Sequence, residues 1–432
     1  MNGNQRREPV PPGYKMTEVG VIPEDWGVRP LGDLYSLQNG YNADGTAYGS
    51  GVRFVNVLEP ITYSHLSVED LVDSVHASEQ IVASYRVKSG DVVFNRTSET
   101  RDELGLAAVF EGRETAIFGG FVIRGRPRTT DVDPIYSGYA LRSQFIRRQI
   151  IPMGQGAIRA NIGQTELRRV LFPLPPLPEQ RAIAEALSDV DNLLDALDRL
   201  ISKKRAVKQA VMQQLLTGKT RLPGFAGEWE ETTLGEIANS IVGGGTPDRE
   251  TERYWGGPIP WITVKDLTDG GLQRSPETIT AEGIAASATR LVSSGTLVVS
   301  TRMALGKVAI FPMDVCINQD LKAIYLKYAR ADSRFMYYRA ILTEKAFSSK
   351  AGGSTVAGIG MSDLRSMGVF LPPLPEQRAI AEVLADIDDE ITALEKRRDK
   401  TRHVKEGMMQ QLLTGRVRLV PRAGADAPGA TS

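Results

Sequence analysis

Few side chains in this sequence are spaced for catalysis. The three histidines, His65, His76 and His403, are scattered and show none of the spacing of a metal motif such as HExxH. Cys316 is the only cysteine, which excludes a zinc finger. The glycines at 243–245 suggest a phosphate cradle, but no Walker or Rossmann pattern surrounds them, and a flexible loop is the favoured interpretation. The sequence therefore predicts a chain that is not an enzyme and has no metal or cofactor of its own.

Hydrogen-bonding chemistry is better represented, in clusters of polar side chains that lie beside glycines, as in GQGAIRANIGQ. Arginine, asparagine, glutamine, serine and threonine bind base edges, and arginine and lysine also bind phosphates. For any single residue, a solvated loop is an equally good interpretation; for the clusters as groups, DNA contact is favoured. The candidate DNA-binding residues are Asn95, Arg96, Thr97, Ser98, Arg101, Gln155, Arg159, Asn161, Ser300, Thr301, Arg302, Lys307, Ser354 and Thr355.

The composition is that of an ordinary globular chain. The 432 residues are 41% hydrophobic, and 52 basic residues balance 52 acidic ones, so a generic polyanion binder is disfavoured, although basic residues need only cluster on one face. A single cysteine fits a reducing compartment, no apolar run reaches the ~20 residues of a membrane span, and the N-terminus lacks the apolar region of a signal peptide. We expect a cytoplasmic protein without membrane contact.

A duplication determines the expected architecture. Residues 175–218 and 372–415 both begin PPLPEQRAIAE and end QQLLTG, and they share 27 identities in 44 positions at a constant offset of 197. Each copy predicts one long helix with proline in its first turn and a stopping glycine at its end. Apolar residues alternate at spacings of four and three, the pattern of a coiled-coil seam. The predicted seam is Ile183, Leu187, Val190, Leu194 and Leu197 in the first copy, and Ile380, Leu384, Ile387, Ile391 and Leu394 in the second.

Two near-identical amphipathic helices favour pairing with each other, while packing of each helix against its own globular domain is the alternative. Because the chain alternates globe, helix, globe, helix, an antiparallel pair would relate the globes by a pseudo-two-fold axis. Strand-like runs at 89–98 and 294–303 place β-structure in both globes. The expected fold is α+β: two α/β-type globular domains separated by two long helices that form an antiparallel coiled coil.

The expected domain boundaries follow the repeat. We expect a disordered tail at 1–14, a first globular domain at 15–173 and a first helix region at 174–218. A second globular domain at 219–371, a second helix region at 372–415 and a flexible tail at 416–432 complete the chain.

These motifs resemble those of the specificity subunit of type I restriction-modification systems. The resemblance rests on TEVGVIPEDW (17–26), the two PPLPEQRAIAE helices with their QQLLTG ends, GGGTPDRETERYWGGPIPWITVKDL (243–267) and INQDLKAI (317–324). It extends over residues 15 to 419 in the usual order of the family. The loop QNGYNADGTAYGSG (38–51) departs from the family's GGTP form.

The resemblance implies a non-catalytic subunit whose two target-recognition domains each read one half of an asymmetric bipartite DNA target. The helices would set the spacer and dock two modification (methyltransferase) subunits, and restriction (motor-nuclease) subunits would join them. S-adenosylmethionine, ATP and Mg²⁺ are then expected on the partner subunits, and double-stranded DNA is the ligand. An independent DNA-binding regulator and a coiled-coil scaffold with protein-binding globes are the alternative functions. Specific DNA binding without partners would favour the regulator. Absence of sequence-selective binding in the assembled complex would favour the scaffold.

Basic residues in the middle of both helices leave a further choice open. The first helix carries Lys203, Lys204, Arg205 and Lys208, and the second carries Lys400, Arg402, His403 and Lys405. They could contact spacer phosphates, form a charged outer face or dock partner subunits.

Overall fold

A computed structural model gives the fold of the chain. It describes residues 10–156, 159–267, 277–302, 304–350 and 358–420. The chain divides into two compact units, and both divisions fall inside long helices. The first unit comprises residues 1–196 and 397–432, and the second comprises residues 197–396.

Among its described residues, the first unit forms two sheets and three two-stranded pairs. The larger sheet has the order β4 (Tyr35–Asn39), β13 (Val122–Pro127), β9 (Val92–Asn95), β11 (Ala107–Phe110) and β6 (His65–Leu66). The smaller sheet has the order β7 (Ser74–Val75), β5 (Tyr48–Val55), β12 (Ala116–Phe118) and β8 (Arg86–Val87). The pairs are β1 (Tyr14–Thr17) with β2 (Gly20–Pro23), β3 (Gly27–Pro30) with β15 (Leu171–Leu174), and β10 (Thr97–Ser98) with β14 (Ala160–Asn161).

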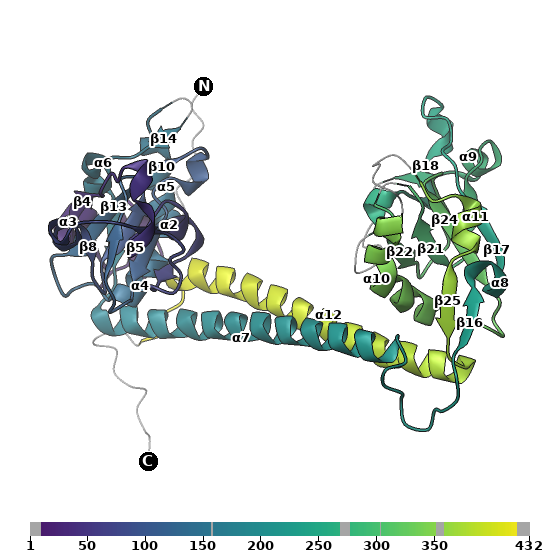
Figure 1. Ribbon diagram of the computed structural model, residues 1–432. Helices are drawn as coiled ribbons and strands as arrows, with labels where there is room; N and C mark the ends of the chain where they lie inside the picture. Colours follow the sequence, from purple (N-terminus) through teal and green to yellow (C-terminus); the bar gives the residue numbers. More distant parts are fainter. Residues whose placement is uncertain (1–9, 157–158, 268–276, 303, 351–357, 421–432) are drawn as a thin grey trace, which may run out of the picture. The chain divides into compact units, whose positions relative to one another are not determined.

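Short helices accompany these sheets. They are α1 (Leu31–Leu34), α2 (Leu58–Thr62), α3 (Glu79–Tyr85), α4 (Pro134–Ala140), α5 (Gln144–Met153) and α6 (Gln164–Arg169). Single 3₁₀ turns form at Gly45–Ala47 and Arg101–Glu103. Figure 1 shows these elements as one globular domain that also contacts the start of α7.

The second unit repeats this plan. One sheet has the order β17 (Ala238–Gly243), β24 (Leu321–Leu326), β21 (Leu297–Ser300) and β22 (Val308–Ile310), and the other has the order β19 (Thr278–Ile279), β18 (Trp255–Ile262), β23 (Val315–Ile317) and β20 (Arg290–Val292). The remaining elements are β16 (Glu230–Thr233) paired with β25 (Gly368–Leu371), α8 (Leu234–Ile237), α9 (Ala281–Ala285), α10 (Ser333–Lys350), α11 (Met361–Arg365), and 3₁₀ turns at Glu252–Tyr254 and Val264–Asp266. Because the shared strands keep the same order, the globular domains are structural duplicates.

The two apolar runs predicted as strands form inner strands: β9 in the five-stranded sheet of the first unit and β21 in a four-stranded sheet of the second. β9 and β21 are each bordered on both sides by other strands, and all four residues of each strand are buried. Gly90 and Gly295 precede them with φ angles of 86° and 78°, a conformation that glycine adopts without strain. The strand predictions at 89–98 and 294–303 are therefore confirmed.

The repeated sequences form α7 (Leu177–Leu215) and α12 (Leu374–Leu412), each of 39 residues. Both helices begin one residue before the first-turn proline. Gly218 and Gly415 follow them with φ angles of 71° and 66°, as helix-stopping glycines do. The predicted long helices are confirmed.

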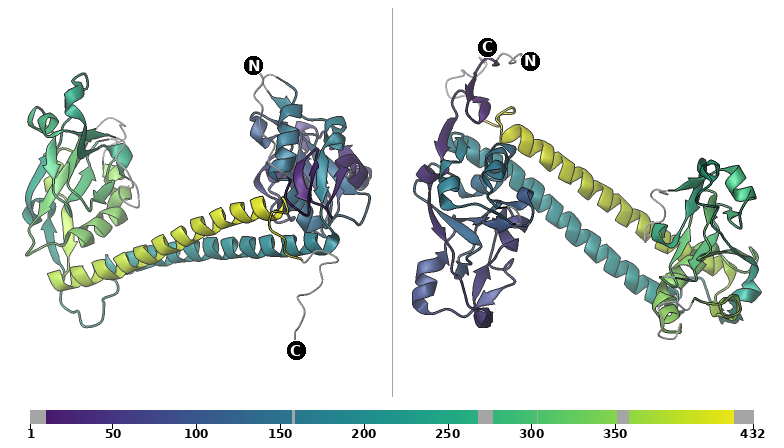
Figure 2. Two further views of the ribbon diagram at one scale, coloured as in Figure 1. Left: turned by 180° about the vertical axis from the view of Figure 1, so that it is seen from behind. Right: turned by 90° about the horizontal axis from the view of Figure 1, so that it is seen from above.

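Within each unit, α7 and α12 lie side by side (Figure 1 and Figure 2). In the first unit the Lys405 ammonium lies 2.6 Å from the Asp191 carboxylate, and in the second unit Lys208 lies 2.6 Å from Asp388. Early residues of α7 therefore meet late residues of α12, and the reverse holds in the other unit. The helices are antiparallel, which confirms the predicted α+β fold with a paired coiled coil.

Each helix start also belongs to the core of its own globular domain. Ile183 and Leu187 are buried together with Leu34 and Phe172 of the first domain and with Leu412 of α12. Both packing arrangements considered from the sequence thus occur at once. Of the predicted seam, Ile183, Leu187, Leu197, Ile380, Leu384 and Ile391 are buried, and Val190, Leu194, Ile387 and Leu394 are half-buried.

The predicted tails lie partly outside the described residues, since residues 1–9 and 421–432 are among those left out. Of the rest, Tyr14 already begins strand β1, and its hydroxyl donates a hydrogen bond to the Gly415 carbonyl at 2.9 Å. Arg418 is held by two carboxylates of the first unit. Ordered structure thus extends into both segments that were expected to be tails.

Candidate nucleic-acid interface

The repeated PEQ motif fastens each helix start to its own globular domain. In α7, the Gln180 side chain accepts a hydrogen bond from the Asp133 N–H at 2.8 Å and donates to the carbonyls of Asp131 and Pro175, both at 2.8 Å. Gln377 of α12 makes the corresponding three bonds, to Asp332, Arg330 and Pro372. Because both glutamines are buried, these bonds fix the angle at which the chain leaves the domain.

The glutamate of the same motif holds a buried ion pair. Glu179 accepts from the Trp26 indole N–H at 2.9 Å and from Arg418, which also binds Asp25 at 2.8 Å. Burial tends to lower the pKa of Arg418, but its hydrogen bonds to Asp25 and Glu179 outweigh burial and raise it. The segment that follows α12 therefore packs against the start of α7 and the N-terminal part of the first domain.

The second unit repeats this ion pair with residues that are continuous in sequence. Arg221, which lies 197 positions before Arg418, binds the buried Glu376 at 2.5 Å. The guanidinium of Arg221 also lies 5.9 Å from the centre of the Trp229 ring. The hydrogen bond to Glu376 raises the pKa of Arg221. In the second unit, the arginine that pairs with the PEQ glutamate therefore lies in the segment that joins α7 to the domain. In the first unit, the corresponding arginine and its partners Asp25 and Trp26 come from opposite ends of the chain.

A second duplicated cluster connects both helices to each domain. The Tyr139 hydroxyl donates to Asp191 of α7 at 2.8 Å, and Lys405 of α12 pairs with the same carboxylate. Tyr338, Asp388 and Lys208 form the same arrangement in the second unit. Burial, followed by the charge of the neighbouring aspartate, raises the pKa of Tyr338 strongly.

The first domain brings two distant polar segments together at one corner. Strands β10 and β14 pair, and the Thr97 hydroxyl donates to the Asn161 side chain at 2.7 Å. Gln155 forms an isolated bridge to Asn161, and Arg159 forms an exposed ion pair with Glu99 at 3.0 Å. We call this set the first-domain corner: Arg96, Thr97, Arg101, Gln155, Arg159 and Asn161. Its exposed donors and acceptors are the chemistry that reads base edges and phosphates.

The loop beside this corner is held by an arginine that is half-buried. Arg147 of α5 donates to the carbonyls of Leu104 at 2.6 Å and Asp102 at 2.7 Å. Burial lowers the pKa of Arg147. The exposed Arg101 lies at the start of this loop, so its backbone is positioned by a fixed partner.

Four of the candidate DNA-binding residues are buried and have partners within the fold. Asn95 is 0% exposed, and its side chain donates to the Glu103 carbonyl at 3.0 Å. Ser98 donates to the Glu103 carboxylate at 2.6 Å. Ser300 donates to the Arg302 carbonyl at 2.5 Å, and Thr301 donates to the Asp320 carbonyl at 3.2 Å. These four side chains stabilise the loops. The prediction that they contact DNA is therefore corrected: their roles are structural.

The second domain has a corner in the corresponding place. The Ile359 N–H donates to the Thr301 carbonyl at 2.8 Å, as the Ile162 N–H does to Arg96 at 3.0 Å in the first domain. Arg302 is exposed, and Lys307 is half-buried. Arg302 lies against Gly358, where a Cβ atom would approach its side chain to 2.8 Å. The candidates Ser354 and Thr355 lie outside the described residues.

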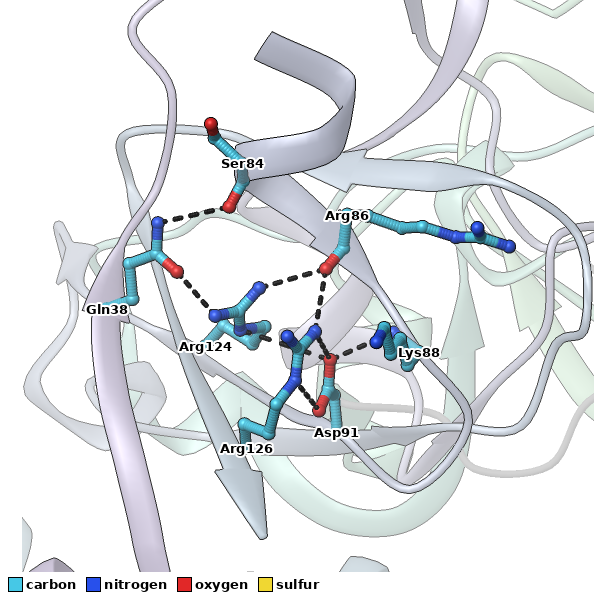
Figure 3. A network of polar contacts seen from close by, with 7 residues as sticks. All are labelled: Gln38, Ser84, Arg86, Lys88, Asp91, Arg124 and Arg126. Carbon is cyan, nitrogen blue, oxygen red and sulfur yellow. Dashed lines mark hydrogen bonds and ion pairs between the residues drawn. The ribbon is translucent and has the colours of Figure 1, made fainter. Parts of the chain in front are cut away.

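A polar network joins the two sheets of the first domain (Figure 3). Arg126 donates two hydrogen bonds to the buried Asp91 carboxylate, at 3.0 Å and 2.7 Å. Arg124 donates to the Arg86 carbonyl at 2.9 Å and to the Gln38 side chain. Burial, and then the charge of Arg126, lowers the pKa of Arg124. The hydrogen bond to Asp91 raises the pKa of Arg126. The network therefore links β13 and β4 of one sheet to β8 of the other.

Several basic residues in the middle of the helices have acidic partners on the other helix. Lys204 pairs with Glu390, and Arg205 pairs with Glu395 at 2.5 Å. Lys208 and Lys405 take part in the tyrosine clusters described above. These pairs show that part of the basic character stabilises the coiled coil, so the number of cations available to phosphate is smaller than the sequence suggests.

Comparison with known proteins assigns this architecture to a family. The model of the type I restriction modification DNA specificity domain matches residues 23–204 and 226–401. The chain is 30% identical, over 420 residues, to a specificity subunit assigned to the type I restriction enzyme MjaX of Methanocaldococcus jannaschii, covering 94% of this chain and 97% of that one. The chain belongs to the specificity subunits of type I restriction-modification systems.

This family supplies the DNA-recognition component and not the catalytic subunits of these systems. The chain is also 24% identical, over 425 residues, to the MjaVIII specificity subunit of the same organism, covering 92% of this chain and 94% of that one. In fold it is similar to the S subunit of M. genitalium, with a TM-score of 0.59 at 16% identity, covering 92% of this chain and 97% of that one. The family predicted from the sequence is confirmed.

Among the described residues, neither a candidate metal site nor a candidate membrane span is present. No group of three or more histidine, cysteine, aspartate or glutamate side chains in that part of the chain is arranged to hold a metal ion. No helix within it combines the length and the apolar character needed to cross a membrane.

Sequence reasoning missed the turns that border both corners. Phe121, between β12 and β13, is 56% exposed, and its carbonyl accepts from the Arg96 N–H at 2.9 Å. Gln319, at the corresponding turn of the second domain, is exposed and accepts from the Thr246 hydroxyl at 2.7 Å. An aromatic residue between two apolar strands suggests a core position. The only available signal for Phe121 was the pair of glycines that precedes it.

Proposed function

We propose that this specificity subunit reads an asymmetric, bipartite DNA target, with one half recognised by each globular domain. The first-domain corner would contact one half-site. The corner around Arg302, Lys307 and the turn that contains Gln319 would contact the other. The paired helices would set the number of unread base pairs between the two half-sites.

One observation carries this proposal: the two domains have the same strand order but different side chains at equivalent corners. β13 pairs with β9 from Val122↔Asn95, and β24 pairs with β21 from Leu321↔Ser300, so the two turns are equivalent by register. In the helices, by contrast, the two copies share 27 of 44 residues. Divergent corners suit the recognition of two different half-sites, and a repeated scaffold suits the docking of the same partner subunit twice.

The partners follow from the same asymmetry between constant helices and variable corners. Two copies of one modification subunit would dock on the two near-identical helix regions, and restriction subunits would join that complex. S-adenosylmethionine, ATP and Mg²⁺ would be bound by these partners. The assembly would act on double-stranded DNA in the cytoplasm.

The test is an exchange of one domain. Residues 26–173 are replaced by the corresponding domain of another specificity subunit, and the modified adenines are mapped after assembly with modification subunits. We expect one half-site to change while the other half-site and the spacer stay constant. The matched exchange of residues 229–371 should change only the other half-site. A change of both half-sites in either chimera contradicts modular recognition.

A further inference from the structure

The turns that lead into β13 and β24 are equivalent in backbone register and different in their side chains. The registers align Phe121 with Asp320 and Gly120 with Gln319. In both domains the residue after the neighbouring strand forms a backbone hydrogen bond with the turn. Arg96 donates its N–H to the Phe121 carbonyl at 2.9 Å, and Thr301 donates its N–H to the Asp320 carbonyl at 2.9 Å. We call these segments the first reading turn (Gly119–Phe121) and the second reading turn (Asn318–Asp320).

The first reading turn exposes an apolar side chain from a backbone that hydrogen bonds hold in place. Phe121 is 56% exposed, although the turn beneath it is fixed by the Val122 N–H bond to the Gly119 carbonyl and by the Arg96 guanidinium bond to the Gly120 carbonyl. A Cβ atom on Gly120 would come within 1.6 Å of the Asn42 amide oxygen, so Asn42 lies directly against the turn. An exposed aromatic side chain therefore lies on a turn that is bonded to Arg96 of the first-domain corner.

The second reading turn presents polar groups instead. The Gln319 side chain is exposed, and its oxygen accepts from the Thr246 hydroxyl at 2.7 Å. Lys322 donates to the Gln319 carbonyl at 3.2 Å, while the buried Asn318 donates to the Asp320 carboxylate at 2.9 Å. The turn is thus as well braced as its counterpart, but it offers an amide where the first domain has glycine.

We propose that these turns are specificity determinants: Phe121 recognises the 5-methyl group of a thymine, and Gln319 recognises a base edge by hydrogen bonding. Phenylalanine contacts the thymine methyl in the major groove, and glutamine pairs with the N6 and N7 atoms of adenine. This inference rests on the proposed function and names the side chains that would carry part of it.

The divergence between the copies favours DNA over a protein as the ligand of Phe121. A partner subunit that docks twice on a duplicated scaffold requires the same apolar residue at both sites. The scaffold does repeat its contact residues, since the PEQ motif, the tyrosine clusters and the helix ends occur twice. At the reading turns the residues differ in size, charge and polarity, as two unlike half-sites require.

The test is a uracil scan of the half-site read by the first domain. The complex with modification subunits is titrated with duplexes in which each thymine of that half-site is replaced in turn by deoxyuridine, which lacks only the methyl group. At one position we expect the wild-type complex to bind about fourfold more weakly, the effect of one buried methyl group. The Phe121→Ala complex should bind both duplexes equally, to within about twofold. Leu58→Ala, a substitution of another exposed apolar residue in the same domain, should keep the fourfold difference.

Other outcomes overturn the assignment. It fails if no thymine of the half-site responds to loss of its methyl group, if the half-site contains no thymine, or if Phe121→Ala still senses the methyl group. Weakened assembly with modification subunits, with unchanged DNA discrimination, would identify a protein contact instead. Failure of the domain exchange would reject the proposed function itself, and this result is independent of the scan.

A variant in the second domain tests the other turn. Gln319→Ala should reduce discrimination about tenfold at one position of the half-site read by that domain, and it should leave the uracil scan of the first half-site unchanged. Unchanged discrimination at every position of its own half-site would remove Gln319 from the assignment. Because Phe121 and Gln319 are both exposed, their variants should unfold at the wild-type denaturant concentration, which confirms that any change concerns DNA.

Discussion

Replacement of Arg418 by alanine should destabilise the first unit, although this residue lies only 14 positions before the end of the chain. Arg418 neutralises Glu179, whose side chain is 2% exposed, while Arg418 itself is 15% exposed. In the variant, the Trp26 indole remains as the side-chain hydrogen-bond donor to this buried carboxylate within the described part of the chain. We therefore expect the first unit to become the less stable of the two.

The magnitude follows from the burial of the pair. Removal of one partner from a buried ion pair costs about 3–5 kcal/mol, because the remaining charge is desolvated without compensation. Arg418 is partly exposed, and the Trp26 bond remains, so we expect the low end, about 3 kcal/mol. The substitution Glu179→Gln in the same chain removes the charge, keeps the acceptor for Trp26 and should recover most of this loss.

Amide hydrogen exchange localises the effect. Peptides of residues 14–34 and 177–190 should exchange faster in Arg418→Ala, while peptides of the second unit keep the wild-type rate. Arg221→Ala is the matched control and should accelerate exchange only in the second unit. A loss below about 0.5 kcal/mol, or equal exchange in both units, would refute the reasoning.

Three further predictions concern stability, pH and spacing. Tyr338→Phe should lower the free energy of unfolding by about 1.5 kcal/mol, because Asp388 loses a hydrogen bond; denaturant titration measures this, and an unchanged midpoint contradicts it. Burial raises the pKa of Tyr35 to about 12, so the unfolded state releases this proton first and stability should fall as the pH rises above ~10; Tyr35→Phe should flatten this fall, and an identical slope would disprove the assignment. Insertion of one heptad into both long helices at equivalent positions should lengthen the spacer or abolish binding without changing the bases read; altered half-site bases in the modification map would count against the proposed division of labour.

The helices were predictable because their signal is local and occurs twice. PPLPEQ and QQLLTG mark both ends of each helix, and the apolar spacing repeats at an offset of 197. The sequence does not show why glutamate and glutamine follow the proline. Their partners, such as Trp26, Asp133 and Arg418, lie between 47 and 239 positions away, and only the fold brings them together.

The candidate site was predicted only in part, for a related reason. Polar residues that end an apolar run, such as Asn95 and Ser300, suggest the start of an exposed loop, but both are the last residues of buried strands. The pairing of Thr97 with Asn161 links segments 64 positions apart, which local pattern cannot reveal. Phe121 was overlooked because aromatic residues between strands usually enter a core.

The central claim is that this subunit determines which DNA sequence is modified. Its most direct test is a map of methylated adenines in cells that carry the modification subunit, with and without this gene. We expect one motif of two unlike half-sites, separated by a constant spacer, that is methylated only when the gene is present. An identical methylation pattern in its absence, or a motif without a bipartite form, would contradict it.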